Sequence, residues 1–214
     1  MCGRFTLTAS PTDVEEELGI EIPSFPPSHN IAPTEEILAI AAIHTAPKAC
    51  FFHWGLIPHW SKQKNKGPKP INARAETIAD TMPFKHLLPR KRCLIVADGF
   101  YEWTSDKTPF HFQNENGRLM TFAGLWDTWQ DSESGEAVSS CTIITTRPNE
   151  LVAKYHDRMP VILEEGNREA WLDVDITDAS LLQKVLEPYD SDKMHACRIS
   201  KAINNPTYKG HRRK

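Results

Sequence analysis

The chain has 214 residues, of which 40% are hydrophobic and 25% charged, and its formal net charge at pH 7 is −3. That length suits one large domain with a sizeable core. The weakly negative charge excludes a surface that is basic throughout, so nucleic-acid binding would need a local basic patch. No apolar run reaches membrane-spanning length and no signal-peptide pattern opens the chain. We therefore expect a cytoplasmic protein, nucleoid-associated if bacterial, with no membrane partner.

Five cysteines are present, an odd number without a Cys-x-x-Cys pair. This pattern argues against both a disulfide framework and a zinc site, and we expect no metal and no cofactor. Cys50, Cys93, Cys141 and Cys197 lie in apolar, strand-like runs, where cysteine usually packs as a small hydrophobic residue. Cys2 is the exception, because of its position at the start of the chain.

If Met1 is removed, Cys2 carries a free α-amine and a thiol on adjacent carbons. The α-amine has an ordinary pKa of about 7.7–8.0, against about 10.4 for lysine, so about a tenth of it is a neutral nucleophile at pH 7. The thiol, with an ordinary pKa of about 8.5, is a few per cent thiolate and intrinsically very nucleophilic. Such a pair can capture an aldehyde twice, first as a Schiff base and then as a five-membered thiazolidine ring.

The next elements along the chain are a short helix and a hairpin. Ser10-Pro11 is a favourable helix start, and Gly19 ends that helix. Residues 36–43 fit either a helix or a buried strand, but their short length and the strand-like run 49–54 favour a strand. The two strands would pair as a hairpin around Ala46-Pro47.

An aromatic loop and a basic stretch follow this hairpin. The loop is Trp54 to Trp60, and its glycine and proline restrict its shape. The stretch from Ser61 to Arg74 contains four lysines and an arginine but no acidic residue. Lysines alone are typical of a solvated loop. Lysines beside an exposed aromatic such as Trp60 also suit single-stranded nucleic acid.

The rest of the chain alternates short strands with short helices, which predicts one mixed α+β domain. We expect a hairpin formed by strands 110–112 and 119–126 around a turn at 114–117, and a short helix capped by Asn149. The remaining expected elements are helical turns within 76–88, strands at 93–97, 140–146, 161–163 and 193–200, and helices at 165–172 and 178–186.

Four polar residues lie next to apolar strands rather than in polar stretches: Cys2, Asn72, Glu102 and His156. Glu102 is flanked by aromatic residues, and desolvation there would raise its pKa towards the range useful for acid–base catalysis. Each residue also has a structural interpretation. Glu102 could pair with an arginine, His156 could be a satisfied core histidine, and Asn72 could cap a turn. There is no phosphate-binding glycine loop and no common hydrolase motif.

Six sequence blocks, in this order, resemble the SRAP family, the SOS-response-associated peptidase domain. Its members shield abasic sites in single-stranded DNA. The blocks are Met1-Cys2-Gly3-Arg4-Phe5, Asn30-Ile31-Ala32-Pro33, Trp54-Gly55-Leu56-Ile57-Pro58, Ile71-Asn72-Ala73-Arg74-Ala75-Glu76-Thr77, Asp98-Gly99-Phe100-Tyr101-Glu102-Trp103 and His156-Asp157-Arg158-Met159-Pro160. The resemblance implies a single α+β domain over residues 1–205. It would have a mixed, largely antiparallel, barrel-like β core flanked by short helices, followed by a basic, flexible tail at 206–214.

The resemblance also implies a mechanism. The Cys2 amine would form a Schiff base with the aldehyde of an abasic site, and the Cys2 thiol would close a thiazolidine cross-link. Glu102 would assist sugar ring opening and proton transfer, His156 would assist proton transfer including reversal, and Asn72 would orient Cys2. The peptidase label would concern processing of the chain's own N-terminus.

The expected partner is single-stranded DNA that contains an abasic site, bound by a monomer. The resemblance places DNA contacts at residues whose chemistry fits backbone binding and base stacking. They are Arg4, Asn30, Pro33, Trp60, Arg74, Thr145 and Arg158. Whether the lysines between 62 and 69 strengthen this binding stays open, as do a duplex or junction preference and a replication partner.

Two other functions compete with this interpretation. Glutamine amidotransferases with an N-terminal nucleophile also begin Met-Cys-Gly and use the cysteine thiol, but they leave Asn72, Glu102 and His156 without a role. A non-catalytic single-stranded DNA binding module would bind intact and abasic strands alike.

Overall fold

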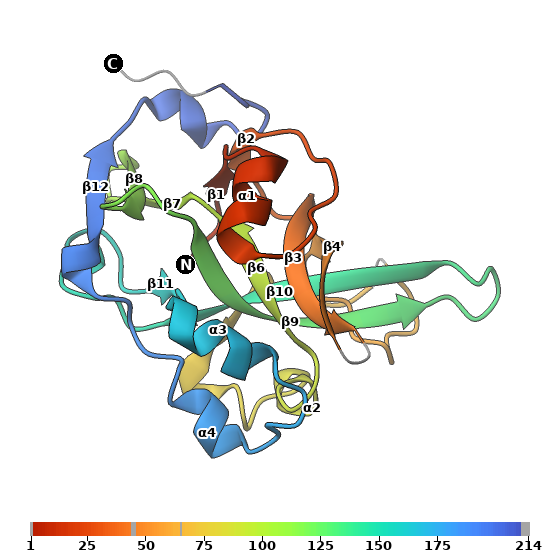
Figure 1. The fold of residues 1–214 in the computed structure, drawn as a ribbon. Helices are drawn as coiled ribbons and strands as arrows, with labels where there is room; N and C mark the ends of the chain where they lie inside the picture. The colour runs from red at the N-terminus through yellow and green to blue at the C-terminus, as the bar shows by residue number, and fades with distance from the viewer. Residues whose placement is uncertain (1, 44–45, 65, 211–214) are drawn as a thin grey trace.

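The computed structural model of the chain describes residues 2–43, 46–64 and 66–210. Its strands form two sheets within one α+β domain, as the sequence predicts (Figure 1). The larger sheet closes on itself, because β9 pairs with β10 at one end of the path and β10 pairs with β4 at the other. The five strands of this barrel are β3 (Glu36–Ile43), β4 (Ala46–Trp54), β6 (Arg92–Ala97), β9 (Met120–Gln130) and β10 (Ala137–Thr146). The expected barrel-like β core is confirmed.

Most strand pairs in the barrel are antiparallel. β3 and β4 form the predicted hairpin, with Ile37 opposite Phe52. Its expected turn at Ala46-Pro47 is wrong, because both residues already belong to β4 and pair with β3; the connecting residues 44 and 45 lie outside the described part of the chain. β10 is the exception, since it runs parallel to β4 and to the short β5 (Asn72–Arg74). β11 (Met159–Pro160) then pairs antiparallel with the end of β10.

The second sheet is open and antiparallel, and the first strand of the chain is one of its inner strands. Its order is β12 (Met194–Arg198), β8 (Pro109–Asn114), β7 (Gly99–Trp103), β1 (Phe5–Leu7) and β2 (Ser28–Ile31). β6 and β7 are separated by the single residue Asp98, so the chain passes directly from the barrel into this sheet. β1 therefore lies beside the strand that continues from the barrel wall.

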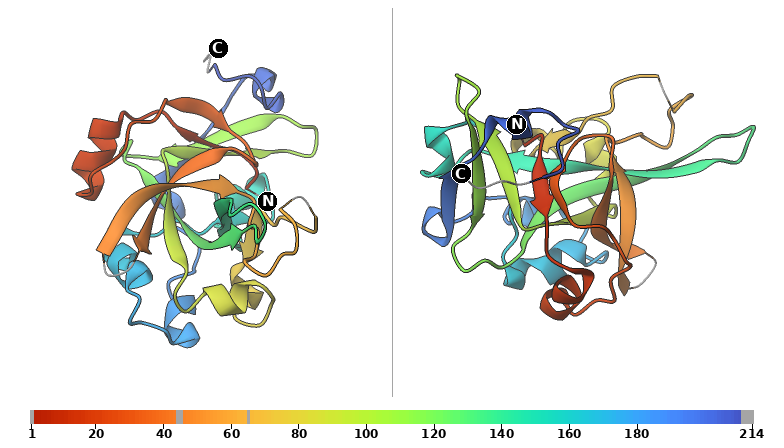
Figure 2. Two further views of the ribbon diagram at one scale, coloured as in Figure 1. Left: turned by 90° about the vertical axis from the view of Figure 1, so that its right-hand side faces the viewer. Right: turned by 90° about the horizontal axis from the view of Figure 1, so that it is seen from above.

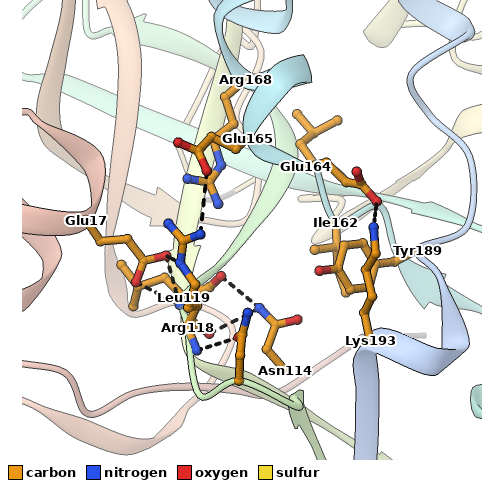
Figure 3. Close-up of a pocket in the computed structure, with 12 residues that line it drawn as sticks. Glu17, Asn114, Arg118, Leu119, Ile162, Glu164, Glu165, Arg168, Tyr189 and Lys193 are labelled. Carbon is orange, nitrogen blue, oxygen red and sulfur yellow. Dashed lines mark hydrogen bonds and ion pairs between the residues drawn. The ribbon is translucent and has the colours of Figure 1, made fainter.

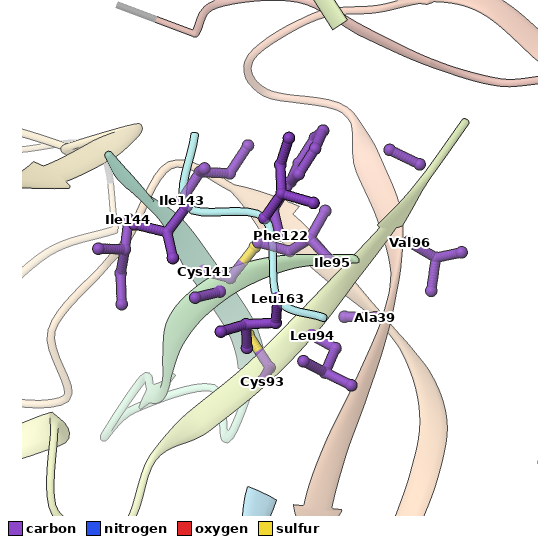
Figure 4. Packing of buried hydrophobic residues seen from close by; sticks show 14 of the residues in the cluster. Ala39, Cys93, Leu94, Ile95, Val96, Phe122, Cys141, Ile143, Ile144 and Leu163 are labelled. Atoms are coloured by element: carbon purple, nitrogen blue, oxygen red, sulfur yellow. The ribbon is translucent and has the colours of Figure 1, made fainter. Parts of the chain in front are cut away.

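The core fills the barrel with aliphatic and aromatic side chains (Figure 4). Cys93 and Cys141 are fully buried among them, as their apolar surroundings predict, and burial raises the pKa of both thiols. Cys50 is half-buried. Cys197 is exposed, so the expectation that it packs as a hydrophobic residue is wrong. It lies on β12 at the edge of the open sheet, where one side has no neighbouring strand among the described residues.

Short helices flank this β structure (Figure 1). The predicted first helix is confirmed: Ser10 accepts a hydrogen bond from the Asp13 N–H, and Gly19 ends the helix with a φ of 66°. The predicted helix at 178–186 is shorter than expected. The helical elements are α1 (Pro11–Leu18), α2 (Phe84–Leu87), α3 (Glu165–Leu172) and α4 (Ala179–Gln183), with 3₁₀ turns η1 (Ala75–Thr77), η2 (Val152–Lys154), η3 (Ser191–Lys193) and η4 (Lys201–Asn204).

The predicted hairpin across residues 114–117 does not form. β8 pairs with β7 and β12 in the open sheet, whereas β9 pairs with β6 and β10 in the barrel. The turn instead carries the chain from one sheet to the other. Asn114 holds this crossing, because its side-chain amide donates to the carbonyls of Arg118 and Leu119 at 3.1 and 3.0 Å.

The β9–β10 hairpin extends beyond the barrel as a long arm (Figure 2). Among the described residues, no helix has the length and apolar character needed to cross a membrane.

Candidate active site around Cys2

Cys2 lies just before β1, and β1 pairs antiparallel with β7, the strand that carries Glu102. Phe5 is opposite Phe100 in this pairing, and the Tyr101 N–H donates to the Arg4 carbonyl at 3.0 Å. Continuing this register brings the N-terminal residues alongside Glu102. The side chains of Cys2 and Glu102 are both buried, with 0% and 2% of their surface exposed. The strand pairing therefore places a thiol and a carboxyl in the same desolvated region.

Asn72 reaches this region from β5, which lies on the barrel wall. Its side-chain amide donates to the Cys2 carbonyl at 2.9 Å. Its Oδ1 atom is buried, and no hydrogen-bond donor within the described ranges reaches it. An acceptor left in this state costs free energy unless a donor is supplied. Asn72 thus fixes the backbone of Cys2 and presents an acceptor beside it.

Glu102 and His156 form the second half of the site. The His156 Nε2 atom lies 3.8 Å from Glu102 Oε2, which is longer than a direct hydrogen bond. One reacting atom could still lie within hydrogen-bond reach of both groups. Burial raises the pKa of Glu102 to about 7. Both protonation states of this carboxyl are therefore populated at neutral pH.

His156 follows η2, where the Val152 N–H donates to Asn149 Oδ1 at 2.9 Å as the sequence predicts. The Arg158 N–H donates to Nδ1 of His156 at 3.0 Å, which assigns the proton of the neutral ring to Nε2. Partial burial lowers the pKa of His156, although the exposed Asp157 carboxylate, 2.9 Å from Nδ1, opposes that change. The ring is therefore mostly neutral at pH 7 and directs Nε2 towards Glu102.

The buried Cys2 thiol differs from the free cysteine that the sequence suggests. Burial, and next the nearby Glu102 carboxylate, raise the pKa of this thiol well above its ordinary value. The thiol is therefore protonated at neutral pH, and a few per cent of thiolate is not present in advance. A base must remove its proton during any attack, and the Glu102 carboxylate, close enough to raise the pKa of the thiol, is the nearby group that can accept it.

The predicted DNA contacts divide into accessible and buried residues. Trp60 is 45% exposed, and the Arg74 side chain is also exposed, as contact with DNA would require. Pro33 and Arg4 are half-buried. Two further predicted contacts are almost fully buried: Asn30 and Thr145, with 0% and 1% of their surface exposed.

The guanidinium group of Arg158 forms hydrogen bonds to Glu76 and Thr145. It donates to both carboxylate oxygens of Glu76, at 2.7 and 2.9 Å, and to the Thr145 carbonyl at 2.6 Å. The bond from Arg158 is the largest cause that lowers the pKa of Glu76. Planar bidentate pairing is also how arginine binds a phosphate. Sequence reasoning missed Glu76, because no pattern within its block reveals a partner 82 residues away.

The C-terminal segment 203–209 covers Asn30 and contacts Arg4. The Asn30 amide donates to the carbonyls of Asn205 and Tyr208, at 3.1 and 2.8 Å. Lys209 donates to the Asn30 carbonyl at 2.7 Å and pairs with Glu35 at 2.6 Å. Arg4 donates to the Asn30 side chain at 2.8 Å and to the carbonyl of residue 203 at 3.3 Å. Residues 211–214 of the expected flexible tail lie outside the described residues.

The loop that carries Trp60 is fixed to the β9–β10 arm. Asp127 accepts hydrogen bonds from the His59 N–H and ring Nδ1, both at 2.8 Å. Trp129 donates to the Ser61 carbonyl at 2.6 Å. The ring of Trp60 therefore extends into solvent from a loop that is held on both sides.

A separate polar pocket of about 230 Å³ lies between α1, α3 and η3 (Figure 3). Its charged groups pair with one another: Arg118 with Glu17 at 3.4 Å, and Lys193 with Glu164 at 2.7 Å. Its lining contains none of the predicted site residues. The pocket is therefore distinct from the region around Cys2.

Comparison with known sequences decides the family. Residues 1–206 match the family model described as SOS response associated peptidase (SRAP). The chain belongs to the SRAP family. The resemblance carried by the six sequence blocks is thereby confirmed.

Relatives in this family extend from bacteria to animals. Abasic site processing protein YoqW of Bacillus subtilis is 43% identical, over 96% of this chain and 95% of that protein. Abasic site processing protein HMCES of Xenopus tropicalis is 29% identical, over 96% of this chain and 75% of that protein. A crystal structure of a Bacteroides thetaiotaomicron protein superposes with a TM-score of 0.83 at 25% identity, covering 96% of this chain and 97% of that one. The chain therefore has the SRAP fold.

Proposed function

We propose that this protein processes abasic sites in DNA, and that it does so by forming a covalent thiazolidine cross-link through Cys2 once Met1 is removed. The names of its SRAP relatives support abasic-site processing. The convergence of four side chains supports the covalent chemistry. Asn72 holds Cys2, and the Glu102–His156 pair lies in the same buried region.

The first step would join the Cys2 amine to C1′ of the ring-opened sugar. The neutral amine adds to the aldehyde carbon, and loss of one water molecule leaves an imine. Glu102, with a pKa raised to about 7 by burial, can donate the proton that the departing oxygen needs and accept one from the amine. The vacant acceptor of Asn72 would receive a hydrogen bond from the Cys2 amine and orient it.

The second step would close the ring. The Cys2 sulfur adds to the imine carbon, and the imine electrons move to nitrogen. Because burial keeps the thiol protonated, its proton must pass to the Glu102 carboxylate, which the Nε2–H of His156 faces, and then to the ring nitrogen. The atoms balance with no net oxidation or reduction. The reverse transfer would reopen the ring, so the same pair would serve reversal.

The DNA would be a single strand, bound by a monomer. The exposed Trp60 would stack on a base, and Arg4, Arg74 and Arg158 would contact phosphates. Lys64 is less available than the sequence suggests, because it pairs with Glu136 at 2.6 Å. Pro33 would complete the surface near the nucleophile.

One denaturing gel tests the cross-link. The protein is incubated with single-stranded DNA containing one abasic site and then denatured by heat. We expect a shifted band that is lost in Cys2→Ala and in a variant that retains a residue before Cys2. The Cys197→Ala variant removes an exposed thiol outside the site and should keep the band. A band that survives in Cys2→Ala would exclude the mechanism.

The same preparation separates the competing functions. An amidohydrolase would release ammonia from glutamine, and we expect no such activity. A non-covalent binding module would retain intact and abasic strands equally and would be unaffected by Cys2→Ala.

A further inference from the structure

β1 is the strand that brings Cys2 to the site, yet the burial pattern of its side chains specifies its pairing register only weakly. It has only three residues, and all three are buried. The register of a strand is normally selected by alternation of buried and exposed side chains, because a slip of one residue exchanges the two faces. That selection is absent in β1. Some other interaction must distinguish the observed register from its neighbours.

Thr6 is the polar residue within this strand, and it is fully buried between Phe5 and Leu7. Its hydroxyl donates to Asp98 Oδ1 at 2.5 Å and lies 3.1 Å from Nε2 of His111. A slip of one residue would replace Thr6 by an apolar side chain at this position. The hydroxyl would lose its partners and the Asp98 carboxylate would lose a donor, which is costly in a buried setting.

Asp98 makes a whole set of bonds to the same short stretch of chain. Its Oδ2 atom accepts hydrogen bonds from the Thr8 N–H, from the Thr8 hydroxyl at 2.6 Å and from the Ala9 N–H at 3.1 Å. Its own N–H donates to the Thr6 carbonyl at 2.8 Å. Because Asp98 is the residue between β6 and β7, these bonds fix β1 to the point where the barrel continues into the open sheet.

Gly99 leaves the space that the His111 ring occupies next to Thr6. A side-chain carbon at position 99 would lie 2.3 Å from Nε2 of His111 and 2.7 Å from the Phe112 carbonyl. Glycine is therefore required for His111 to approach Thr6. Asp98, Gly99 and His111 together form a binding place for the threonine hydroxyl.

We infer that Asp98 is a positioning residue that selects the register of β1 and thereby places Cys2 beside Glu102. This inference rests on the proposed cross-linking function. A slip of one residue would move Cys2 by about 3.3 Å along the strand. A displacement of about 1 Å can already cost on the order of 10²-fold in rate. The hydrogen bonds of Asp98 thus govern the reaction without touching the reacting atoms.

The test uses the variants Asp98→Asn and Thr6→Val and a control variant. Two pairs of properties are measured in each. The control is Asp106→Asn, since Asp106 accepts hydrogen bonds from the Thr104 and Thr108 hydroxyls, at 2.5 and 2.7 Å, without contacting β1. The first pair is the single-turnover cross-linking rate at saturating abasic single strand and the affinity for the intact strand. The second pair is amide hydrogen exchange at Tyr101, which donates to the Arg4 carbonyl, and at Ala123 of the barrel strand β9, which donates to the Val161 carbonyl.

We expect Asp98→Asn and Thr6→Val to slow cross-linking at least tenfold, with affinity for the intact strand changed less than twofold. The Tyr101 amide should exchange faster in both variants, while Ala123 stays protected. Asp106→Asn should keep the rate and the Tyr101 protection. Thr6→Val decides the matter if Asp98→Asn does not fold. If the wild-type protein cross-links, and Asp98→Asn and Thr6→Val cross-link as fast as Asp106→Asn, the role of Asp98 is overturned. If the wild-type protein does not cross-link, the proposed function itself is overturned.

Discussion

The Glu102 carboxyl and the His156 imidazole, 3.8 Å apart, have pKa values in the reverse of their ordinary order. Burial raises the pKa of Glu102 to about 7 and lowers that of His156 below 6.5. A single proton on the pair therefore resides mainly on the carboxyl. Because its pKa is close to neutral pH, the Glu102 carboxyl can act as acid in one step and as base in the next.

This relationship predicts how stability depends on pH. The pKa of Glu102 is higher in the folded chain than its ordinary value of 4.5, so the folded protein binds the proton more tightly. That contribution is fully present below pH 4.5 and is lost as the pH rises through about 7. The loss amounts to about 3 kcal/mol for a shift of this size. Glu102→Gln, which cannot ionise, should therefore gain stability relative to wild type as the pH rises.

Urea unfolding of both proteins at pH 5 and pH 8 measures this difference. We expect the gap between Glu102→Gln and wild type to widen at pH 8. The same gap at both pH values would mean that the carboxyl ionises in the folded state as it does in water.

The same substitution should separate chemistry from binding. Glu102→Gln keeps the shape of the side chain but removes its acid–base function, so cross-linking at saturating abasic single strand should slow by about 10²-fold or more. Affinity for an intact single strand should change little, since Glu102 is buried. Rate and affinity are measured on one preparation, and an equal fall in both would assign Glu102 a structural role.

Asn30 should contribute more to stability than to DNA contact. It is fully buried and holds the C-terminal segment through Asn205 and Tyr208. Asn30→Ala would remove one hydrogen bond from each of these carbonyls and from the Arg4 guanidinium, at a cost of about 1–3 kcal/mol. Thermal unfolding and proteolysis of the C-terminal segment measure the effect. Arg147→Ala is the matched control, because it removes the exposed ion pair between Arg147 and Glu187, worth less than about 1 kcal/mol, away from this segment. Unchanged stability with lost DNA affinity would instead make Asn30 a direct contact.

The sequence predicts the local elements of this fold better than their pairing. Strands 36–43 and 93–97 follow from short apolar runs, the first helix follows from the capping residues Ser10 and Gly19, and all three are present. The hairpin across 114–117 fails because a turn signal does not determine which sheet each flanking strand joins. That choice depends on strands outside the turn, β7 and β12 for β8 and β6 for β9.

For the site, too, the sequence predicts local features better than those that depend on distant parts of the chain. The sequence blocks identify Cys2, Asn72, Glu102 and His156, and the structure brings them together. Asn30 lies in the same kind of block, but its burial comes from a segment 175 residues later. The high pKa of the Cys2 thiol likewise comes from packing, which no local pattern reveals.

Glu76 should weaken DNA binding by occupying Arg158. Its two carboxylate oxygens hold the guanidinium in the geometry that a phosphate would take. Glu76→Gln removes a negative charge from this surface and loosens the pair, so affinity for a single strand should rise about two- to fivefold at low salt. Binding titrations at several salt concentrations should show a steeper salt dependence in the variant, because more counterions are released when Arg158 meets phosphate. Weaker binding in Glu76→Gln would show that Glu76 orients Arg158 for DNA.

Trp60 should contribute binding energy without contributing to stability. Its ring is 45% exposed on a loop that Asp127 and Trp129 fix to the β9–β10 arm. Stacking of one base on an aromatic ring is worth about 1–3 kcal/mol, so Trp60→Ala should lower affinity for a single strand about tenfold or more. The unfolding temperature should change little. Met82→Ala is the matched control, since Met82 is an apolar side chain with 48% exposure that no contact assigns to the site. Fluorescence anisotropy with an intact single strand measures the affinities, and equal binding by the two variants would remove Trp60 from the DNA surface.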